Sequence, residues 1–290
     1  MSKPLTFIGY ASGLAANNQG CAKGPLQLKA HAIENQLSEK GLAHWQTMLV
    51  PEAESKKEVL TQVANLLTQL AKVTYDLTQQ KQPFIVFGGD HSCAIGTWSG
   101  VSAANLGEKI GLIWIDAHMD SHTFNTTPSG NIHGMPLAAL LGYGDGALTK
   151  ILSPQSKLKP EHVSLIGVRS FEAGEAALLR DLGVRIYQMP EIKERGLSVV
   201  MQEAIARAKE GTIGFGVSLD LDAIDPKDAP GVGVPEPDGI ISGDLCQALT
   251  MIQQEKQLFG VEIVEYNPDL DEDNKTEQLI HKIVLSIFGD

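Results

Sequence analysis

The stretch from Gly111 to Asp120, GLIWIDAHMD, is the most informative part of the chain. Its first five residues are apolar without alternation, which is typical of a parallel strand buried on both faces. Polar side chains follow at intervals of two residues, namely Asp116, His118 and Asp120. Because side chains at such intervals start on one side of an extended chain, these residues are expected to point the same way. The stretch therefore predicts a buried strand that carries metal-ligand residues where it ends.

Along the rest of the chain, short runs rich in β-branched residues alternate with helical patterns. Strands are expected at Leu5–Gly9, Thr47–Val50, Pro83–Phe87, Gly111–Ile115, Val163–Val168, Val184–Tyr187, Ile213–Leu219 and Gly260–Val264. Helices are expected at Pro25–Lys40, Ser55–Gln80, Glu172–Leu182, Ser198–Glu210, Gly243–Gln254 and Thr276–Phe288. This alternation predicts an α/β fold, with a parallel sheet covered by helices on both faces. No internal repeat, low-complexity tract or linker is visible, so a single domain over residues 1–290 is expected.

The composition excludes several classes of protein. Of the 290 residues, 43% are hydrophobic and 20% are charged, and this apolar fraction is too high for a disordered chain. The 23 Lys and Arg against 35 Asp and Glu give a net charge of −12, with no basic block. This acidic balance argues against a nucleic-acid binder and against a protein that binds anionic membranes.

The cysteines and the N-terminal segment bear on the compartment. The 3 cysteines are widely spaced and form no CxxC pair, so neither a zinc knuckle nor a disulfide scaffold is predicted. The segment MSKPLTFIGYASG lacks the long apolar run of a signal peptide. No window reaches the roughly 18–20 apolar residues that a membrane helix needs. These features predict a soluble, cytoplasmic protein.

Acidic and imidazole side chains lie at the ends of four predicted strands. They are His91 after PFIVF, Asp116, His118 and Asp120 after GLIWI, Asp220 and Asp222 after IGFGVSL, and Glu265 after VEIV. In an open parallel sheet, ligands bind at the carboxyl ends of the strands. A single Asp at a strand end is commonly a turn former or a helix N-cap, but four such motifs at one edge favour a functional site.

The charges in these motifs predict a metal site. Carboxylates buried close together are costly unless they protonate or pair with positive charge. Lys and Arg are absent from the motifs, so metal is the expected counter-charge. Two imidazoles and four carboxylates that can bridge suit two divalent ions. An oxygen-rich set with some imidazole favours Mn²⁺ or a similar ion over zinc.

The motifs GGDHS at 88–92, DAHMD at 116–120 and SLDLDAIDP at 218–226 resemble those of the ureohydrolase family of arginases and agmatinases, with arginases the most similar. The resemblance extends from Gly20 near the N-terminus to the VEYNP stretch near the C-terminus. It implies a three-layer αβα fold around an eight-stranded parallel sheet. It also implies two Mn²⁺ ions per chain, a small guanidino substrate, and a homo-oligomer, either a trimer or a hexamer.

The resemblance implies a role for each residue that matches a family metal ligand. One ion would be held by His91, Asp116, Asp120 and Asp220, and the other by Asp116, His118, Asp220 and Asp222, so that Asp116 and Asp220 bridge. Asp90 would orient a ligand or a loop.

The chemistry implied by the resemblance is hydrolysis of a guanidinium group to urea and an amine. A guanidinium carbon resists neutral water, and the two ions would lower the pKa of a bridging water so that hydroxide attacks it. Asp120 would hydrogen-bond this hydroxide, His133 would protonate the leaving amine, and Glu265 would hold the substrate cation. The plainer alternatives are a structural hydrogen bond for His133 and an ordinary ion pair for Glu265.

The loop after DAHMD bears on the substrate. Its SGNIHGMP portion resembles arginases, in which this loop donates hydrogen bonds to the substrate α-carboxylate, and Thr127, Ser129 and Asn131 are the candidates here. A carboxylate left without such donors would be costly to bury. The loop therefore favours L-arginine, hydrolysed to L-ornithine and urea. The alternative substrates are agmatine, hydrolysed to putrescine and urea, and another guanidino acid.

Three positions depart from the usual arginase pattern. His122 stands where arginases usually have an Asn for the carboxylate, and a histidine can still donate there. Glu172 stands where an Asp usually faces the α-amine, and its extra methylene shifts the carboxylate. Val234 replaces a common Thr at the rim of the site. These departures leave the reaction class unchanged and bear on the substrate.

Two hypotheses from other classes are open. A deacetylase-like hydrolase with a single zinc ion needs fewer carboxylates than DAHMD and DLD supply. A non-catalytic binding protein is expected to have lost ligands, whereas all six, together with His133 and Glu265, are present. One zinc per chain would favour the first hypothesis, and no urea from any guanidino compound would favour the second.

Overall fold

A computed structural model describes residues 4–36, 43–52 and 58–289 of the chain. Eight strands form one sheet in the order β2-β1-β3-β8-β7-β4-β5-β6, and all neighbouring pairs are parallel. They are β1 (Leu5–Tyr10), β2 (Ala43–Leu49), β3 (Phe84–Gly88), β4 (Gly111–Ile115), β5 (Val163–Val168), β6 (Arg185–Gln188), β7 (Phe215–Asp220) and β8 (Leu258–Val264). The predicted parallel sheet is confirmed, and each strand lies within a few residues of its expected bounds.

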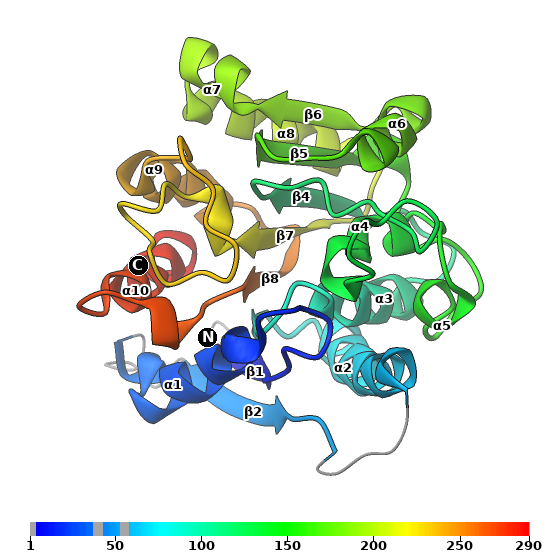
Figure 1. The fold of residues 1–290 in the computed structure, drawn as a ribbon, viewed down its shortest axis with the longest axis horizontal. Coiled ribbons are helices and arrows are strands. Elements are labelled where there is room, and N and C mark those ends of the chain that lie inside the picture. Colours follow the sequence, from blue (N-terminus) through cyan, green and yellow to red (C-terminus); the bar gives the residue numbers. More distant parts are fainter. Residues whose placement is uncertain (1–3, 37–42, 53–57, 290) are drawn as a thin grey trace.

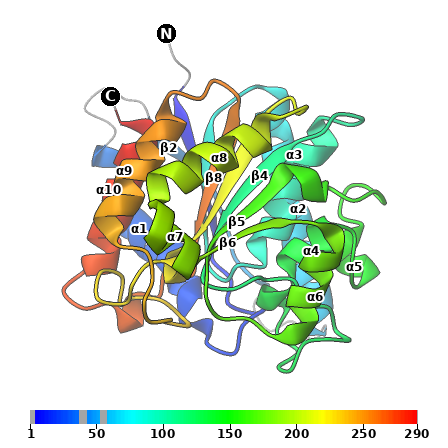
Figure 2. The ribbon, with the colours of Figure 1, turned by 90° about the horizontal axis from the view of Figure 1, so that it is seen from above.

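Helices cover both faces of the sheet (Figures 1 and 2), which confirms the predicted three-layer αβα fold. One face carries α1 (Gly24–Ala30), α7 (Met189–Arg195), α8 (Leu197–Lys209), α9 (Ser242–Gln253) and α10 (Lys275–Phe288). The other carries α2 (Val59–Gln79), α3 (Cys93–Ala104), α4 (Pro136–Leu140), α5 (Gly146–Thr149) and α6 (Ala173–Leu182). Connections contain the short 3₁₀ helices η1 (Gln19–Lys23), η2 (Ile33–Gln36), η4 (Ile132–Gly134), η5 (Pro160–His162), η6 (Leu221–Ala223) and η7 (Pro268–Leu270).

The two faces of each central strand enter different hydrophobic cores. In β4, Ile113 and Ile115 pack in the core that contains α8, α9 and α10, whereas Leu112 and Trp114 pack in the core that contains α2 and α3. All four side chains are completely buried. Because both faces are covered, the strand itself has little room for polar side chains. Polar residues that serve a site therefore follow at its carboxyl end.

The predicted helices differ from the structure in two ways: one ends early, and α3, α4, α5 and α7 were not predicted. The helix expected at Pro25–Lys40 ends as α1 at Ala30, because Ala32 adopts a φ of 55° that no helix can continue. Positions 37–40 of that prediction lie outside the described residues, as do positions 55–57 of the helix expected at Ser55–Gln80, which is observed as α2. The sequence patterns did not predict α3, because ten of its residues are buried and it therefore lacks a polar face.

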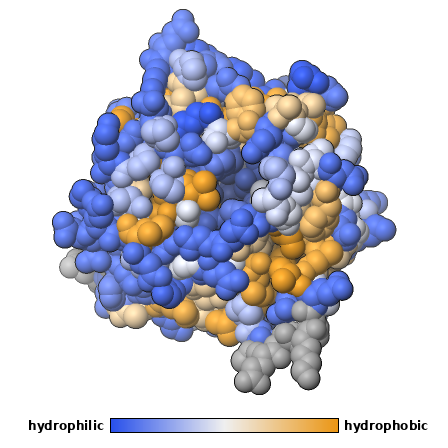
Figure 3. Space-filling view, in the orientation of Figure 1, coloured by the Kyte–Doolittle hydropathy of each residue, from blue (hydrophilic) through white to orange (hydrophobic). Residues whose placement is uncertain are grey.

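The helices and the surface hydropathy are the two features that concern membrane association. None of the helices in the described part of the chain combines the length and hydrophobicity needed to cross a membrane. On the face shown in Figure 3, hydrophobic side chains form separate patches among hydrophilic ones.

Candidate metal centre and active site

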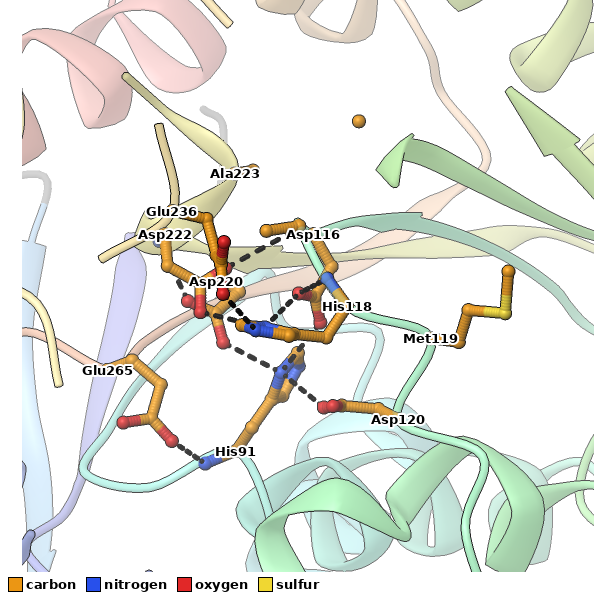
Figure 4. A network of polar contacts seen from close by, with 12 residues as sticks. His91, Asp116, His118, Met119, Asp120, Asp220, Asp222, Ala223, Glu236 and Glu265 are labelled. Atoms are coloured by element: carbon orange, nitrogen blue, oxygen red, sulfur yellow. Dashed lines mark hydrogen bonds and ion pairs between the residues drawn. The ribbon is translucent and has the colours of Figure 1, made fainter. Parts of the chain in front are cut away.

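The central strands β3, β8, β7 and β4 are neighbours in the sheet, and their carboxyl ends bring the predicted site residues together. His91 follows β3, Asp116 follows β4, Asp220 ends β7 and Glu265 follows β8. Each of these residues has at most 3% of its surface exposed. Figure 4 shows their side chains converging from separate strands. Segments far apart in the sequence therefore supply one buried polar cluster.

The first group of metal-ligand side chains surrounds the His91 ring. Its Nδ1 lies 3.3 Å from Asp116 Oδ2, 3.0 Å from Asp120 Oδ2 and 3.1 Å from Asp220 Oδ2. None of these contacts has good hydrogen-bond geometry, so this buried nitrogen has no hydrogen-bond partner among the described residues. A nitrogen lone pair and three carboxylate oxygens directed at one another form a set that fits a divalent cation.

The second group shares Asp116 with the first. His118 Nδ1 lies 3.1 Å from Asp222 Oδ2 and 3.5 Å from Asp116 Oδ1. The candidate ligand atoms of Asp116, His118 and Asp222 lie within 4.8 Å of one another, as do those of His91, Asp116 and Asp220. A carboxylate common to two adjacent groups can bridge two ions. The side chains therefore fit a two-ion site.

The residues of the DAHMD motif do not all serve the same group. Asp120 lies beside His91 and His118 lies beside Asp222, whereas Asp116 contacts both histidines. The chain has left β4 after Ile115, so strand alternation no longer governs these side chains. The two-residue spacing thus indicates correctly that the motif lies at the site. It does not predict which of the two metal-ligand groups each residue joins.

Charge repulsion within the cluster favours added cations. Burial, followed by the charge of Asp116, raises the pKa of Asp120. Burial and the charge of Asp222 raise the pKa of Asp220 well above its usual value, and burial raises the pKa of Asp222 to about 6. Divalent ions supply the positive charge that these carboxylates need in order to ionise together.

Trp114 supports both groups from within β4. Its ring stacks on His91, with centroids 4.3 Å apart and planes 15° from parallel. Its Nε1–H donates to Asp116 Oδ2 over 2.8 Å. The sequence did not predict this role, because Trp114 lies within an apolar run that is typical of a buried strand. Only its indole N–H, which needs a partner when buried, could have signalled it.

Asp120 and Glu265 adopt backbone conformations that are uncommon outside glycine. Their φ values are 47° and 65°. Such conformations cost about 1–3 kcal/mol and are concentrated at functional sites, where the surrounding structure holds them. Their occurrence at two residues of the same cluster indicates a site built for function rather than for stability.

Glu265 and His133 form a hydrogen-bonded pair beside the metal-ligand groups. His133 Nδ1 lies 3.1 Å from Glu265 Oε1, which also accepts from the His91 N–H over 2.9 Å. Cys21 donates its thiol to Glu265 Oε2, with Sγ 2.9 Å away. Burial opposes ionisation of both partners, but their mutual interaction outweighs it, raising the pKa of His133 to about 9 and lowering that of Glu265. At neutral pH the pair is therefore an imidazolium and a carboxylate.

A cavity of about 240 Å³ opens over these groups. It is lined by His118, Asp120, His122, Pro128, Ser129, His133, Gly134, Glu172, Glu175, Asp220, Asp222, Val234 and Glu265. Of the residues predicted to bind substrate, His122, Ser129 and Glu172 line the cavity. Thr127 and Asn131 do not, but both belong to the same loop and contact Ser129, through the Thr127 hydroxyl and the Asn131 backbone N–H.

Comparison with known proteins identifies the family. The family model described as "Arginase family" matches residues 3–289. The chain belongs to the arginase family. Arginases are metal-dependent enzymes that hydrolyse linear amidines, and the metal-ligand groups at the strand ends agree with this membership.

Individual arginases are similar to this chain over their whole length. An arginase of Bacillus caldovelox is 40% identical over 300 residues, which cover 99% of both chains. The crystal structure of that arginase superimposes with a TM-score of 0.93 and covers 99% of both chains at 40% identity. An arginase of Entamoeba histolytica, solved in complex with L-ornithine, has a TM-score of 0.91 at 30% identity and covers 100% of both chains.

His122, a departure from the usual arginase pattern, has both ring nitrogens engaged. Nε2 lies 2.9 Å from Glu172 Oε2, and Nδ1 lies 3.2 Å from Thr126 Oγ1. The hydrogen bond from His122, together with a smaller one from Glu175, lowers the pKa of Glu172. His122 therefore holds Glu172 at the cavity wall, rather than offering a free donor to a substrate.

Three further residues around the arginase-family site were not among the predicted site residues. Glu175 lines the cavity and accepts hydrogen bonds from the backbone of Glu172 and Ser121. Its place three residues after Glu172 is a capping-box signal at the start of α6, which could have found it. Glu236 Oε1 lies 3.6 Å from His118 Nε2. No local pattern signals Glu236, since it comes from a loop distant in sequence.

Arg169 is the third of these residues, and it fixes two loops of the site. Its guanidinium donates to the backbone carbonyls of Asp222 and Ala223, and also to those of Glu236 and Pro237. Every donor is used on backbone oxygens, so Arg169 is a structural clamp that holds the Asp222 and Glu236 segments together.

Asp90 directly precedes the proposed ligand His91, and its side chain links the N-terminal loop to the site. It accepts from the Ala15 N–H over 3.1 Å and from the Ser92 N–H over 3.1 Å. The Ala15 carbonyl in turn accepts from the His133 N–H. The predicted loop-orienting role of Asp90 thus has a structural counterpart in the placement of His133.

Proposed function

We propose that this chain hydrolyses L-arginine to L-ornithine and urea, using two Mn²⁺ ions per chain. The observation that carries the proposal is the pair of metal-ligand groups sharing Asp116, with Glu265 and His133 beside them at the floor of one cavity. The similarity to proteins named as arginases supports it, as does the L-ornithine bound to one of them.

In this proposal Glu265 binds the substrate cation. Its carboxylate is buried and ionised, and a planar guanidinium offers paired N–H donors that match a carboxylate. Substrate would replace part of the contact that His133 now makes with Oε1. The donors from Cys21 and from the His91 backbone would keep the carboxylate in place meanwhile.

The proton steps fall to Asp120 and His133. Two bound divalent ions would supply a hydroxide nucleophile at neutral pH by lowering the pKa of water. Asp120, at the cavity wall, is placed to accept a hydrogen bond from the nucleophile. His133, an imidazolium below its pKa of about 9, donates its proton to the departing amine nitrogen. Its side chain is 19% exposed, so solvent can return the proton.

The proposed ligands are those expected from the family resemblance, and Mn²⁺ is the proposed metal. Four carboxylates with two imidazoles form an oxygen-rich set of the kind that suits Mn²⁺, whereas zinc sites favour nitrogen and sulfur. Metal analysis of protein loaded with Mn²⁺ tests the stoichiometry, and one zinc per chain with deacetylase activity would contradict it.

Agmatine is a second candidate substrate, favoured by the rim of the cavity. His122 is already engaged with Glu172 and Thr126, and neither Thr127 nor Asn131 lines the cavity. Ser129 is then the proposed substrate-binding residue best placed to meet an α-carboxylate, which agmatine lacks.

A urea-release assay on Mn²⁺-loaded protein tests the proposal, with arginine, agmatine and guanidinobutyrate as parallel substrates. We expect the largest kcat/KM for arginine. A larger value for agmatine would replace arginine as the substrate. No urea from any of the three would contradict the proposal and favour a non-catalytic binding protein.

We further propose that residues 1–290 form one domain, that the protein is a homotrimer or homohexamer, and that it acts in the cytoplasm. The single sheet shared by N- and C-terminal strands supports one domain. Light scattering coupled to gel filtration tests the assembly, and a monomer would contradict it.

A further inference from the structure

Glu262 is a buried acidic residue that the proposed mechanism does not use. It lies within β8 between Val261 and Ile263 and has none of its surface exposed. A carboxylate in such a place is costly unless hydrogen-bond donors surround it. Its partners therefore indicate what it does.

The first partner of Glu262 is a donor from α3. Trp98 Nε1 donates to Glu262 Oε1 over 2.6 Å, and Cys93 Sγ lies 3.8 Å from Oε2. An indole N–H can only donate, so Oε1 has to accept. Burial raises the pKa of Glu262 above its usual value, and the charge of His91, together with hydrogen bonds to Ser218 and Trp98, offsets part of that rise. The ionised form thus has donors on several sides.

Ser218 connects this carboxylate to the metal-ligand groups. Ser218 in β7 is the register partner of Glu262 in β8, and paired residues of neighbouring strands lie about 4.8 Å apart and project from the same face. Ser218 Oγ lies 2.8 Å from His91 Nε2. Both Ser218 and His91 are buried. A buried chain of polar contacts therefore runs from Trp98 through Glu262 and Ser218 to His91.

We propose that Glu262 is a positioning residue that acts through Ser218 to fix the tautomer and orientation of His91, with the Nδ1 lone pair directed at the metal site. An ionised carboxylate only accepts, so the Ser218 hydroxyl donates to it. The Ser218 oxygen is then left to accept from Nε2–H of His91. Neutral His91 consequently carries its proton on Nε2 and keeps Nδ1 free for a metal ion.

The stacking of Trp114 on His91 completes this arrangement. The stack fixes the plane of the imidazole, but it does not distinguish one ring nitrogen from the other. Ser218, supported by Glu262, makes that distinction. The inference rests on the proposed function only in requiring a divalent ion at the site, and it is independent of which guanidino compound is hydrolysed.

The test is calorimetric titration of metal-free protein with Mn²⁺ alone, comparing the parent with Glu262→Gln. Trp98 pins the amide oxygen, so the amide N–H₂ of the variant faces Ser218. The Ser218 hydroxyl then turns its proton toward His91 Nε2, which drives the imidazole proton onto Nδ1. Of the two sites in the variant, we expect the one that binds Mn²⁺ more weakly to have an affinity about 10–100-fold lower than in the parent. This is the usual range for losing an outer hydrogen-bond partner of a metal ligand.

Glu277→Gln is the matched control. Glu277 is another buried glutamate, 5% exposed, hydrogen-bonded by Gln27 and His31 on the α1 and α10 side. It should lose stability in a thermal melt without losing Mn²⁺ affinity. An equal loss of affinity in both variants, or an affinity of Glu262→Gln within twofold of the parent, would overturn the proposal.

A double-mutant cycle with Ser218→Ala provides the second readout. If Glu262 acts through Ser218, the double variant binds Mn²⁺ no more weakly than Ser218→Ala alone, and additive losses would contradict the proposal. If Glu262→Gln does not fold, Glu262→Asp replaces it, since it keeps the charge but is one methylene shorter. A parent that binds Mn²⁺ but releases no urea would refute the proposed function and leave this inference standing.

Discussion

The floor of the cavity and its rim are built in different ways. The floor is formed by Asp220, Glu265 and His133, which line the cavity. Asp220 and Glu265 lie at strand ends together with the buried proposed ligands His91 and Asp116, and at most 3% of each of these four residues is exposed. The rim consists of the loop 121–131 and the start of α6, where the Glu172 side chain is 59% exposed. Floor residues are fixed by backbone hydrogen bonds and by buried neighbours. Rim residues are fixed mostly by hydrogen bonds to one another.

Because of this difference, the floor is expected to determine the reaction and the rim the choice of substrate. The floor supplies the charge and the proton donor that any guanidine hydrolysis needs, and changing it disturbs the ends of central strands. The rim meets the far end of the substrate, and its exposed polar groups can change without touching the core. The departures His122, Glu172 and Val234 all line the cavity and lie in connecting segments rather than in strands. The comparison predicts that substitutions in the floor abolish turnover, whereas substitutions in the rim redistribute it among substrates.

The largest effect is expected for Asp116→Ala. Asp116 belongs to both metal-ligand groups, so its loss should reduce bound Mn²⁺ and urea release together, down to background. Metal analysis and the urea assay measure the two quantities. Asp244→Ala, an exposed change on α9, is the control and should alter neither. Full activity with an intact metal content would show that Asp116 is not a ligand.

A large effect of a different kind is expected for His133→Asn. Loss of the general acid should lower kcat about 10²–10⁴-fold while leaving Mn²⁺ bound. The acid form of His133 predominates below its pKa of about 9, so kcat/KM of the parent should fall as the pH rises through that value. This alkaline limb should be absent from His133→Asn. The same limb in both proteins would assign it to another group, and His281→Asn is the control.

A moderate effect is expected for Ser129→Ala, which removes a hydroxyl from the rim. If Ser129 meets the α-carboxylate, KM for arginine should rise about tenfold, as for a hydrogen bond to a charged group, while KM for agmatine stays unchanged. Asn125→Ala, an exposed change on the same loop, is the control. Equal changes for both substrates would count against carboxylate recognition by this residue.

The smallest effect is expected for Cys21→Val. Cys21 lies beside Glu265, which forms a hydrogen-bonded pair with His133. The substitution removes the thiol donor to Glu265 Oε2, and a weak donor of this kind is worth about 1 kcal/mol, or roughly fivefold in KM. Cys21→Ser keeps a donor and should restore most of the loss. Cys246→Val, on the half-buried face of α9, controls for removal of a thiol. A KM unaffected by Cys21→Val would show that the other donors suffice to hold Glu265.

Much of the floor was predictable, because the end of each strand is marked by a pattern of neighbouring residues. An apolar run followed by Asp or His is visible within ten residues, as in the stretch from Gly111 to Asp120. Where local patterns are weak, prediction failed. Helix α3 has no polar face, and the helix expected after Pro25 is cut short by the backbone at Ala32. The rim was only partly predictable, since which polar residues of a loop face a cavity depends on how the loop folds.

The sequence by itself determined the parallel α/β sheet, the edge at which chemistry occurs and the residue types gathered there. Those features follow from burial and charge, which act on neighbouring residues along the chain. Only the tertiary structure decided that His122 is engaged with Glu172, that Cys21 holds Glu265, and that Ser218 links Glu262 to His91. These contacts depend on the order of strands, which places β8 between β3 and β7 and β4 beside β5. No local pattern encodes that order, because it is set by how all the helices and strands pack together.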